Sequence, residues 1–358
     1  MQRSLSLSTT QITWIIVASA PVGINTLPRM INEQTEQTGW LFLVATALII
    51  YLYMRLIIIL PERYPGLSIF EITTHILGKW AGSLFILFLS LMMIVGTSLS
   101  LRLLADGIIN YMLFHTPAMV IILFMLFVLF YTLTRGTETI VYINEILQPI
   151  ILLTMTMIMF LVINKARFEE LTPIISEQIN VIQGSAVSFY PFLFIFVVVY
   201  FFPYVRNHSS LKKGIFLGIS LILWISLTLF ILSVTLFGTV ELNYIEYPSI
   251  EFARLIQFPM LERFHIFYLI YWIIYAFTVH TVTLYAGSTG ISYVSKKKNM
   301  VWIAVACTIT FLISLYPDNI EKAREYAMYL NYVNLCFVFF AFPLLLLIDT
   351  IKRKVNSQ

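Results

Sequence analysis

The sequence has little charge and almost no cysteine. Asp, Glu, Lys and Arg make up 11% of its 358 residues, less than half of the share of about 25% that soluble domains carry. This shortage excludes a soluble globular domain, and it also excludes a disordered chain, which requires high charge and low hydrophobicity. The net charge is only +4 and no basic patch stands out, so we expect no nucleic-acid partner.

Motifs for catalysis or metal binding are also lacking. The two cysteines, Cys307 and Cys336, lie in apolar segments, and no Cys and His spacing of a metal site is present. We find no Ser, His and Asp arrangement and no phosphate-binding loop. The sequence therefore predicts no enzyme, no cofactor and no metal.

Long apolar runs take the place of charge. Hydrophobic residues make up 59% of the chain, and its mean hydropathy is +0.89. Runs of about 20 apolar residues suit transmembrane helices, which satisfy their backbone hydrogen bonds internally. We predict one all-α integral membrane domain over residues 1–358 with ten transmembrane helices. The predicted segments are 11–31, 39–60, 80–102, 117–134, 142–163, 184–204, 214–238, 265–294, 300–316 and 331–349.

Basic residues collect in the loops on one side of this predicted bundle. With the N terminus inside, the inner loops and tail hold 14 of the 22 Lys and Arg residues but only five of the 18 acidic residues. Cytoplasmic loops carry the excess of Lys and Arg. We therefore predict that both termini are cytoplasmic, with a tail over 350–358.

The first predicted helix is interrupted near its middle by the run 20–25 (APVGIN). Pro21 removes a helical hydrogen bond, and Gly23 lets the backbone unwind. The amides of residues 23–25 would then be free at the start of the second half-helix, where the dipole favours an anion such as a substrate carboxylate. A packing kink is the alternative interpretation, since Pro and Gly are common in membrane helices.

The sixth helix carries a proline at the corresponding place. Pro191 follows Pro21 by 170 residues, close to half of the chain, and inverted-repeat transporters interrupt corresponding helices of their two halves. We predict repeats over about 8–163 and about 180–349, with helices one and six interrupted. The run from Phe189 to Phe196 contains no glycine, which predicts a tight pocket with aromatic walls.

Two loops have the pattern of amphipathic helices. Segment 67–77 places apolar residues among polar ones and predicts a helix on the cytoplasmic membrane surface. Segment 248–264 contains Pro248 and Pro259 and predicts two short helices on the outer side, large enough to cover a vestibule.

Short motifs occur in order along nearly the whole chain. They are Ser8-x-x-Gln11, Gly23-Ile24-x-x-Leu27-Pro28-Arg29, Tyr64-Pro65-Gly66, Leu77-Gly78-Lys79-Trp80, Phe202-Pro203-Tyr204, Tyr247-Pro248-Ser249 and Leu261-Glu262-Arg263. In this order they resemble the B subunit of bacterial endospore germinant receptors. That family is similar to permeases of the amino acid/polyamine/organocation superfamily, so the resemblance implies a five-plus-five inverted repeat of the LeuT type.

The resemblance also implies a place and partners. It implies residence in the spore inner membrane, assembly with an A subunit and a lipoprotein C subunit, and binding of a small-molecule germinant, often an amino acid. One departure lies in helix six, where relatives often carry a glycine and an acidic residue but residues 195–198 here are all apolar. An uncharged, more apolar or smaller ligand would fit this change, and so would a weak site.

Candidate pocket residues come from four predicted helices. Gly96 and Thr97 on helix three are small groups able to face helix one, although close packing is the commoner role of such residues. His280 lies near the middle of helix eight, where an ionisable group is a functional candidate and a neutral His bonded to a hydroxyl is the structural alternative. The candidate ligand-binding residues are Pro21, Val22, Gly23, Ile24, Asn25, Gly96, Thr97, Tyr190, Phe192, Phe194 and His280.

Three functions fit these features. The first is a germinant-sensing subunit that binds a small molecule between the two breaks and signals to its partners. The second is a proton-coupled amino acid transporter, which the nearly uncharged midplane disfavours. The third is a receptor scaffold that binds no ligand itself, which the glycine-poor sixth helix keeps open.

Overall fold

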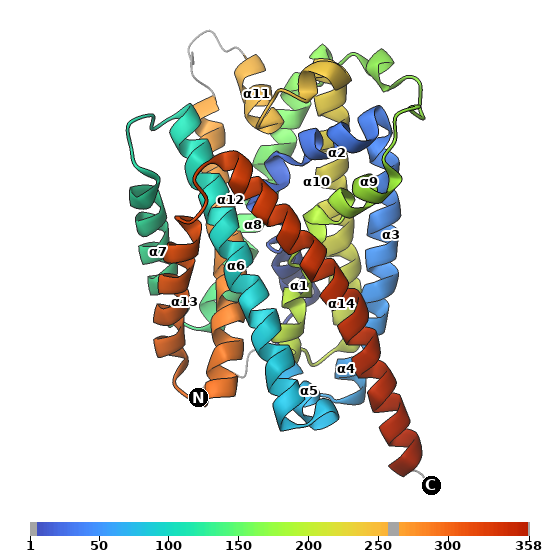
Figure 1. Ribbon diagram of the computed structural model, residues 1–358, viewed down its shortest axis with the longest axis vertical. Coiled ribbons are helices and arrows are strands. Elements are labelled where there is room, and N and C mark those ends of the chain that lie inside the picture. The colour runs from blue at the N-terminus through green and yellow to red at the C-terminus, as the bar shows by residue number, and fades with distance from the viewer. Residues whose placement is uncertain (1–5, 257–264, 357–358) are drawn as a thin grey trace.

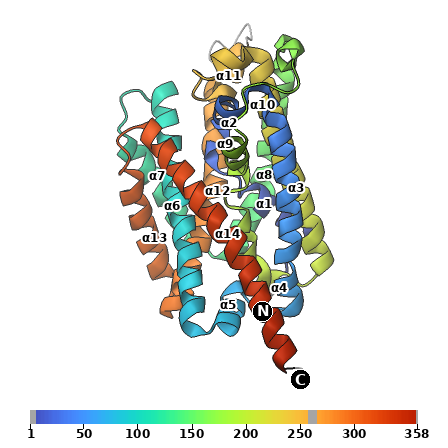
Figure 2. The same cartoon turned by 45° about the vertical axis from the view of Figure 1, so that its right-hand side comes forward.

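The computed structural model describes residues 6–256 and 265–356. All regular elements in these two ranges are helices, and most of the long ones run along the vertical axis of Figure 1. Figure 2 shows the same bundle after a turn of 45°, with α7 and α13 at one side and α3 at the other. The elements are α1 (Thr9–Val17), η1 (Val22–Asn25), α2 (Leu27–Thr35), η2 (Glu36–Thr38), α3 (Gly39–Ile57), α4 (Ile59–Arg63), α5 (Ile69–Leu77), α6 (Lys79–Tyr111), α7 (Ala118–Thr134), α8 (Thr137–Val162), η3 (Ile163–Lys165), η4 (Phe168–Leu171), α9 (Val181–Ser188), η5 (Tyr190–Phe192), η6 (Ile195–Tyr204), α10 (His208–Leu242), α11 (Pro248–Leu255), α12 (His265–Ser295), α13 (Asn299–Ser314) and α14 (Ile320–Asn356).

Helical structure is present in each of the ten predicted segments. Within the described residues, seven stretches have the length and hydropathy of a membrane span. Two further apolar helices, α7 and α13, are shorter at 17 and 16 residues, and helix one is divided into short pieces. The protein is therefore a multi-pass membrane protein, and ten crossings stay a prediction.

The first half of helix one packs against α10 through two glycines spaced by four residues. Gly214 faces Ile12, and Gly218 faces Ile16. A Cβ at Gly214 would also come within 3.0 Å of the carbonyl oxygen of Thr9. Small residues at this spacing let helices approach closely, and packing is a main source of helix association in a membrane. The segment that leads into the break of helix one is therefore tightly held.

α6 and α12 form the most extensive helix contact among the described elements. Gly287 and Gly290 of α12 lie against Ile94 and Ser90 of α6, where an added Cβ would collide with its neighbours. The small residues bring the two backbones together along the middle of both helices. Polar side chains can therefore bond across this contact, as the hydroxyls of Thr97 and Thr283 do at 2.7 Å.

The predicted helix in segment 67–77 is confirmed as α5. Its N-cap is Ser68, whose hydroxyl accepts a hydrogen bond from the Glu71 amide while the Glu71 carboxylate accepts one from the Ser68 amide at 2.8 Å. This reciprocal pair satisfies two backbone donors that a helix start leaves open. Of the two helices predicted in 248–264, the first is confirmed as α11, and the second lies in residues outside the described ranges.

Asp349 connects the C-terminal part of α14 to the end of α4, at the end of the bundle opposite α11 (Figure 1). Its carboxylate pairs with Arg63 at 2.5 Å and Arg353 at 3.2 Å, and accepts a hydrogen bond from the Tyr64 hydroxyl at 2.5 Å. The side chain of Asp349 is only 2% exposed, so these donors offset the cost of burying its charge. Burial, followed by the hydrogen bond to Asp349, raises the pKa of Tyr64.

Candidate functional site

Helix one is interrupted where the sequence predicts. α1 ends at Val17, and the hydroxyl and the amide of Ser19 both donate to the Ile16 carbonyl, at 2.6 and 2.9 Å. Pro21 is extended, with φ −66° and ψ 150°, and a 3₁₀ turn, η1, follows over Val22–Asn25. All residues from Pro21 to Asn25 are buried, so this irregular backbone lies inside protein, as a membrane segment requires.

One detail of the prediction for this break is wrong. The sequence predicts free amides at residues 23–25, but the amide of Ile24 donates to the carbonyl of Pro21 at 2.9 Å. The Thr26 amide and hydroxyl both donate to the Gly23 carbonyl, at 3.0 and 2.8 Å. The run has folded into a tight turn because Pro21 sets an extended start from which a 3₁₀ bond can close.

Helix six is interrupted more extensively than helix one. α9 ends at Ser188, and η5 and η6 then continue the chain to Tyr204 as 3₁₀ structure. η6 has ten residues, whereas 3₁₀ runs longer than about four residues are uncommon and often mark a hinge. Two asparagines of α14 satisfy carbonyls near the break: Asn331 donates to Ala186 at 2.9 Å, and Asn334 donates to Leu193 at 2.7 Å.

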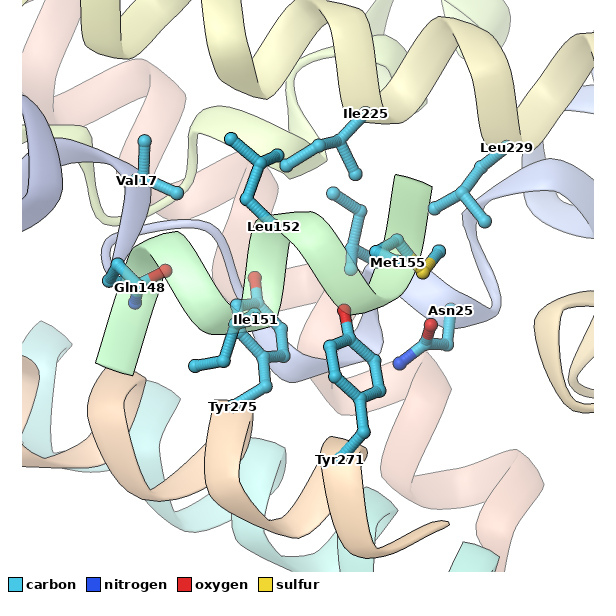
Figure 3. A pocket seen from close by; sticks show the side chains of 11 residues that line it. Val17, Asn25, Gln148, Ile151, Leu152, Met155, Ile225, Leu229, Tyr271 and Tyr275 are labelled. Atoms are coloured by element: carbon cyan, nitrogen blue, oxygen red, sulfur yellow. The ribbon is translucent and has the colours of Figure 1, made fainter. Parts of the chain in front are cut away.

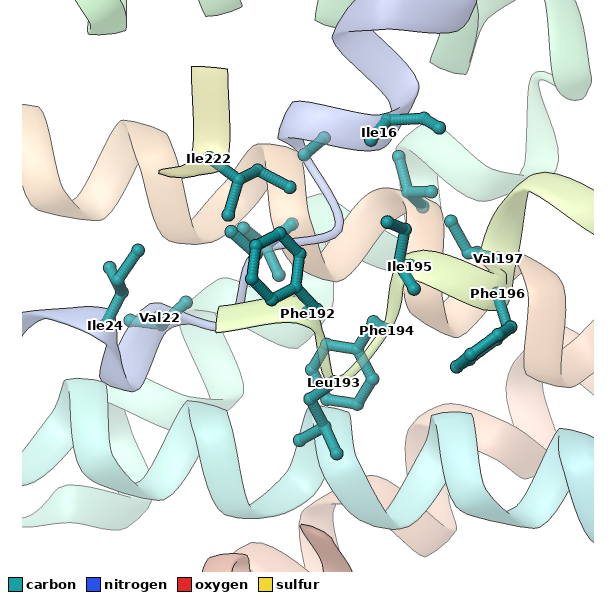
Figure 4. Close-up of a cluster of buried hydrophobic side chains, with 14 of the residues drawn as sticks. Ile16, Val22, Ile24, Phe192, Leu193, Phe194, Ile195, Phe196, Val197 and Ile222 are labelled. Atoms are coloured by element: carbon teal, nitrogen blue, oxygen red, sulfur yellow. The ribbon is translucent and has the colours of Figure 1, made fainter. Parts of the chain in front are cut away.

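The two breaks meet in the core without space between them. A Cβ at Gly23 would collide with the hydroxyl end of Tyr190, and a Cβ at Gly96 would collide with the ring of Phe194. Figure 4 shows Phe192, Leu193 and Phe194 in one turn of helix six, with Val22 and Ile24 of helix one close by. The predicted aromatic-walled site is thus closed by the aromatic side chains themselves.

The remaining predicted residues lie in the same core with other neighbours. Phe192 is among the largest fully buried side chains. The Thr97 hydroxyl lies 2.7 Å from that of Thr283, and His280 Nε2 lies 3.1 Å from the Ser100 hydroxyl. Thr97 and His280 therefore join α6 to α12. The other ring nitrogen of His280, Nδ1, has no hydrogen-bond partner among the described residues.

One face of α12 holds the interrupted segment of helix one. Tyr275 donates to the Ala20 carbonyl at 2.8 Å, and the indole of Trp272 donates to the Val22 carbonyl at 3.4 Å. Tyr268 donates to the side-chain oxygen of Asn25 at 2.7 Å. These donors bind two backbone carbonyls and one side chain of the break, and so hold the break against α12.

These donors are not among the residues predicted from the sequence, although the sequence contains a signal for them. Tyr268, Trp272 and Tyr275 are spaced by four and three residues, so they share one helix face, and each has an apolar body with a polar tip. Ser249, which the outer motif contains, also donates to the Asn25 side-chain oxygen, at 2.9 Å. Two of the motifs listed above thus meet at the break.

A small cavity lies beside the break of helix one and is lined in part by Val17, Ile24 and Asn25. Its volume is about 10 Å³, room for about one water molecule, and its polar groups come from Asn25, Gln148, Tyr271 and Tyr275 (Figure 3). Gln148 is fully buried; its amide nitrogen donates to Thr278 at 2.9 Å, while its oxygen has no partner among the described residues. The cavity is too small for an amino acid in this arrangement of helices.

An ion-pair network joins three elements above the breaks. Glu246, in the loop before α11, pairs with Arg29 of α2 at 2.5 Å and also with Arg324 of α14. Arg29 pairs in addition with Glu33 at 2.8 Å. The three bridged side chains are 14–23% exposed, so they are partly shielded from water. The network closes this end of the bundle over the half-helix that follows the break.

Solved transporters have the same fold. The structure of Mhp1, a nucleobase-cation-symport-1 family transporter in a closed conformation with bromovinylhydantoin bound, matches with a TM-score of 0.70 at 13% identity, over 92% of this chain and 75% of that one. A substrate-bound, outward-open Na⁺-coupled sialic acid symporter matches with a TM-score of 0.65 at 11% identity, over 87% of this chain and 75% of that one. These are LeuT-fold transporters, so the predicted fold class is confirmed.

Sequence comparisons give the family. Spore germination protein YndE of Bacillus subtilis is 25% identical over 98% of each chain, and spore germination protein A2 of the same organism is 27% identical over 100% of this chain and 99% of that one. Spore germination protein B2, also from Bacillus subtilis, is 24% identical over 93% of this chain and 92% of that one. The family model described as spore germination protein matches residues 6–323. With a match that covers most of its length, the chain belongs to the spore permease family of spore germination proteins.

Proposed function

We propose that this chain is the germinant-binding subunit of a receptor in the spore inner membrane, with both termini in the cytoplasm. It works with an A subunit and a lipoprotein C subunit, as the sequence resemblance implies, and it binds a small germinant, an amino acid, between the breaks of helices one and six. The names of its relatives support a role in germination, and its fold supports a buried ligand site.

The observation that carries the proposal is the contact between Gly23 and Tyr190. It joins the two interrupted helices at the place where discontinuous helices hold substrates. A ligand enters only if Tyr190 moves away, so it binds one arrangement of helices and not the other. A ligand shifts an equilibrium only to the extent that it distinguishes the two states, and here the distinction is built into the site.

The backbone carbonyls at the break of helix one favour signalling over sodium-coupled uptake, because they already have hydrogen-bond donors. In discontinuous helices such carbonyls coordinate the coupling cation. Here the carbonyls of Ala20 and Val22 accept hydrogen bonds from Tyr275 and Trp272 of the chain itself. A sodium ion at this place would have to displace both donors, which would leave buried hydroxyl and indole groups unpaired.

Ligand binding by the purified chain tests the proposal. A panel of labelled amino acids and nucleosides is offered to the detergent-purified wild type, to Gly23→Leu, and to Ala45→Leu, which adds a similar volume to an exposed position of α3. We expect saturable binding of one ligand by the wild type and by Ala45→Leu, and none by Gly23→Leu, because the new side chain fills the space between the breaks.

Two results would contradict the proposal in different ways. Unchanged binding by a folded Gly23→Leu protein would place the ligand elsewhere. Absence of binding by all three proteins would favour the scaffold. The fold also supports a second candidate, the amino acid transporter, and gradient-driven uptake into vesicles that contain only this chain would establish it.

A further inference from the structure

A basic hollow lies beside α5, and Figure 1 shows α5 at one end of the bundle. It has a volume of about 620 Å³ and is formed by α5, the start of α6 and the end of α12 with the turn that follows. Its polar lining residues are Thr74, Lys79, Ser83, Ser292, Tyr293, Lys296 and Lys297. Three ammonium groups and four hydroxyls therefore border one space.

The three lysines differ from the cations at this end of the bundle that are paired with a carboxylate. Arg63 and Arg353 pair with Asp349, and Lys212 pairs with Glu62. In the described part of the chain, no carboxylate forms an ion pair with Lys79, Lys296 or Lys297. Their like charges repel one another across the hollow, and an anion that enters it would relieve this repulsion.

The backbone adds to the positive potential. α6 is a helix of 33 residues whose N-cap, Gly78, has no side chain to accept from the first-turn amides. The dipole of such a helix favours an anion at its N terminus, which is at Lys79 on the border of the hollow. The turn at the opposite border is fixed, because the Ser292 hydroxyl donates to the Lys297 carbonyl at 2.8 Å.

Exposed apolar side chains flank the hollow. On α6, Trp80 is 84% exposed and Leu84 is 68% exposed, directly after Lys79. At the start of α13, Met300 and Val301 are 61% and 51% exposed, directly after the lysine turn. Trp at the end of a membrane helix is typical of the lipid headgroup level. The hollow thus combines a polar, cationic interior with a border suited to hydrocarbon.

We propose that this hollow binds the phosphate headgroup of an anionic membrane lipid, with the acyl chains on the apolar residues beside it. Basic pockets between transmembrane helices at a membrane surface are suited to such headgroups. Three further surface hollows, such as the one between α7 and α13, are lined almost entirely by apolar residues and offer contacts mainly for acyl chains. The bound lipid joins α5 and α6 to the end of α12, so the occupancy of the hollow depends on how these helices are arranged.

Native mass spectrometry of the full-length chain in detergent tests the proposal. Phosphatidylglycerol and phosphatidylcholine with the same acyl chains are offered at equal concentrations to the wild type and to the triple variant Lys79→Gln/Lys296→Gln/Lys297→Gln. The control is Arg55→Gln/Arg135→Gln/Lys213→Gln, which removes three exposed cations outside the hollow. The triple Lys→Arg variant at the hollow keeps the charge and checks that the fold tolerates substitution there.

The wild type, the control and the Lys→Arg variant should retain one phosphatidylglycerol in preference to phosphatidylcholine. The Lys→Gln variant should lose this preference by roughly tenfold or more, given the attraction of each lysine for anionic lipid. An unchanged preference, or an equal loss in the control, would overturn the assignment. A further experiment adds glycerol phosphate, which lacks acyl chains, to the wild type with its bound lipid. If it displaces the lipid at equal concentration, the site recognises free phosphate and the assignment to a lipid is wrong.

Discussion

The breaks in helices one and six are held in different ways. The break of helix one is a short 3₁₀ turn that contains a glycine. Its carbonyls accept hydrogen bonds from hydroxyl and indole groups of α12. Helix six has no glycine at its break, extends into ten residues of 3₁₀ structure, and receives amide donors from α14. Each break is therefore tied to a different long helix. We therefore expect a motion that separates Gly23 from Tyr190 to change the position of α12 relative to α14.

The strongest test of this comparison removes the anchor of helix six. In Asn334→Leu, the carbonyl of Leu193 loses a donor in the core, and an unpaired buried polar group costs about 1–3 kcal/mol. We expect a clear fall in the thermal unfolding midpoint of the detergent-purified protein. Val333→Leu, on an exposed face of the same helix, serves as the control and should leave the midpoint unchanged. Equal midpoints for wild type and Asn334→Leu would show that α14 does not anchor the break.

Removing one anchor of helix one should have a smaller effect. Tyr275→Phe takes away the donor to the Ala20 carbonyl, but Trp272 and Tyr268 still hold the neighbouring residues. We expect a loss of stability of about 1 kcal/mol, measured by the same unfolding assay. Tyr271→Phe is the matched control, because the Tyr271 hydroxyl forms no hydrogen bond within the described ranges. A loss larger than that of Asn334→Leu would reverse the order of the two anchors.

We expect the smallest loss of stability at the ion-pair network that connects helix one to α14. Glu246 bridges Arg29, which follows the break of helix one, and Arg324, on the helix that anchors helix six. Glu246→Gln should lower stability by less than about 1 kcal/mol, because partly exposed ion pairs contribute little. Salt screens such pairs. We therefore expect added salt to lower the unfolding midpoint of the wild type more than that of Glu246→Gln. Identical salt dependence of the two proteins would indicate that the network does not contribute.

The sequence predicts the fold class because apolar runs of this length have few alternatives in a membrane. It also predicts the break of helix one, since Pro21 and Gly23 act on the local backbone. The contacts of Tyr275 and Asn334 escape it because they depend on how α12 and α14 are rotated toward the breaks. The amide of Ile24 was predicted free, but a local 3₁₀ bond satisfies it. The candidate ligand residues stay a prediction, although Gly23 lies against Tyr190 and Gly96 lies against Phe194.

Helix six is longer as 3₁₀ structure than the same residues would be as an α-helix. Its residues advance about 2.0 Å each along the axis, against about 1.5 Å in an α-helix. The eight residues of η6 before Pro203 would therefore shorten by about 4 Å if they changed to α-helical winding. Such a change would pull Phe194 relative to the fixed end at Tyr204 while the chain stays helical throughout. A change of winding would thus move Phe194 along the axis of helix six without tilting the helix as a whole.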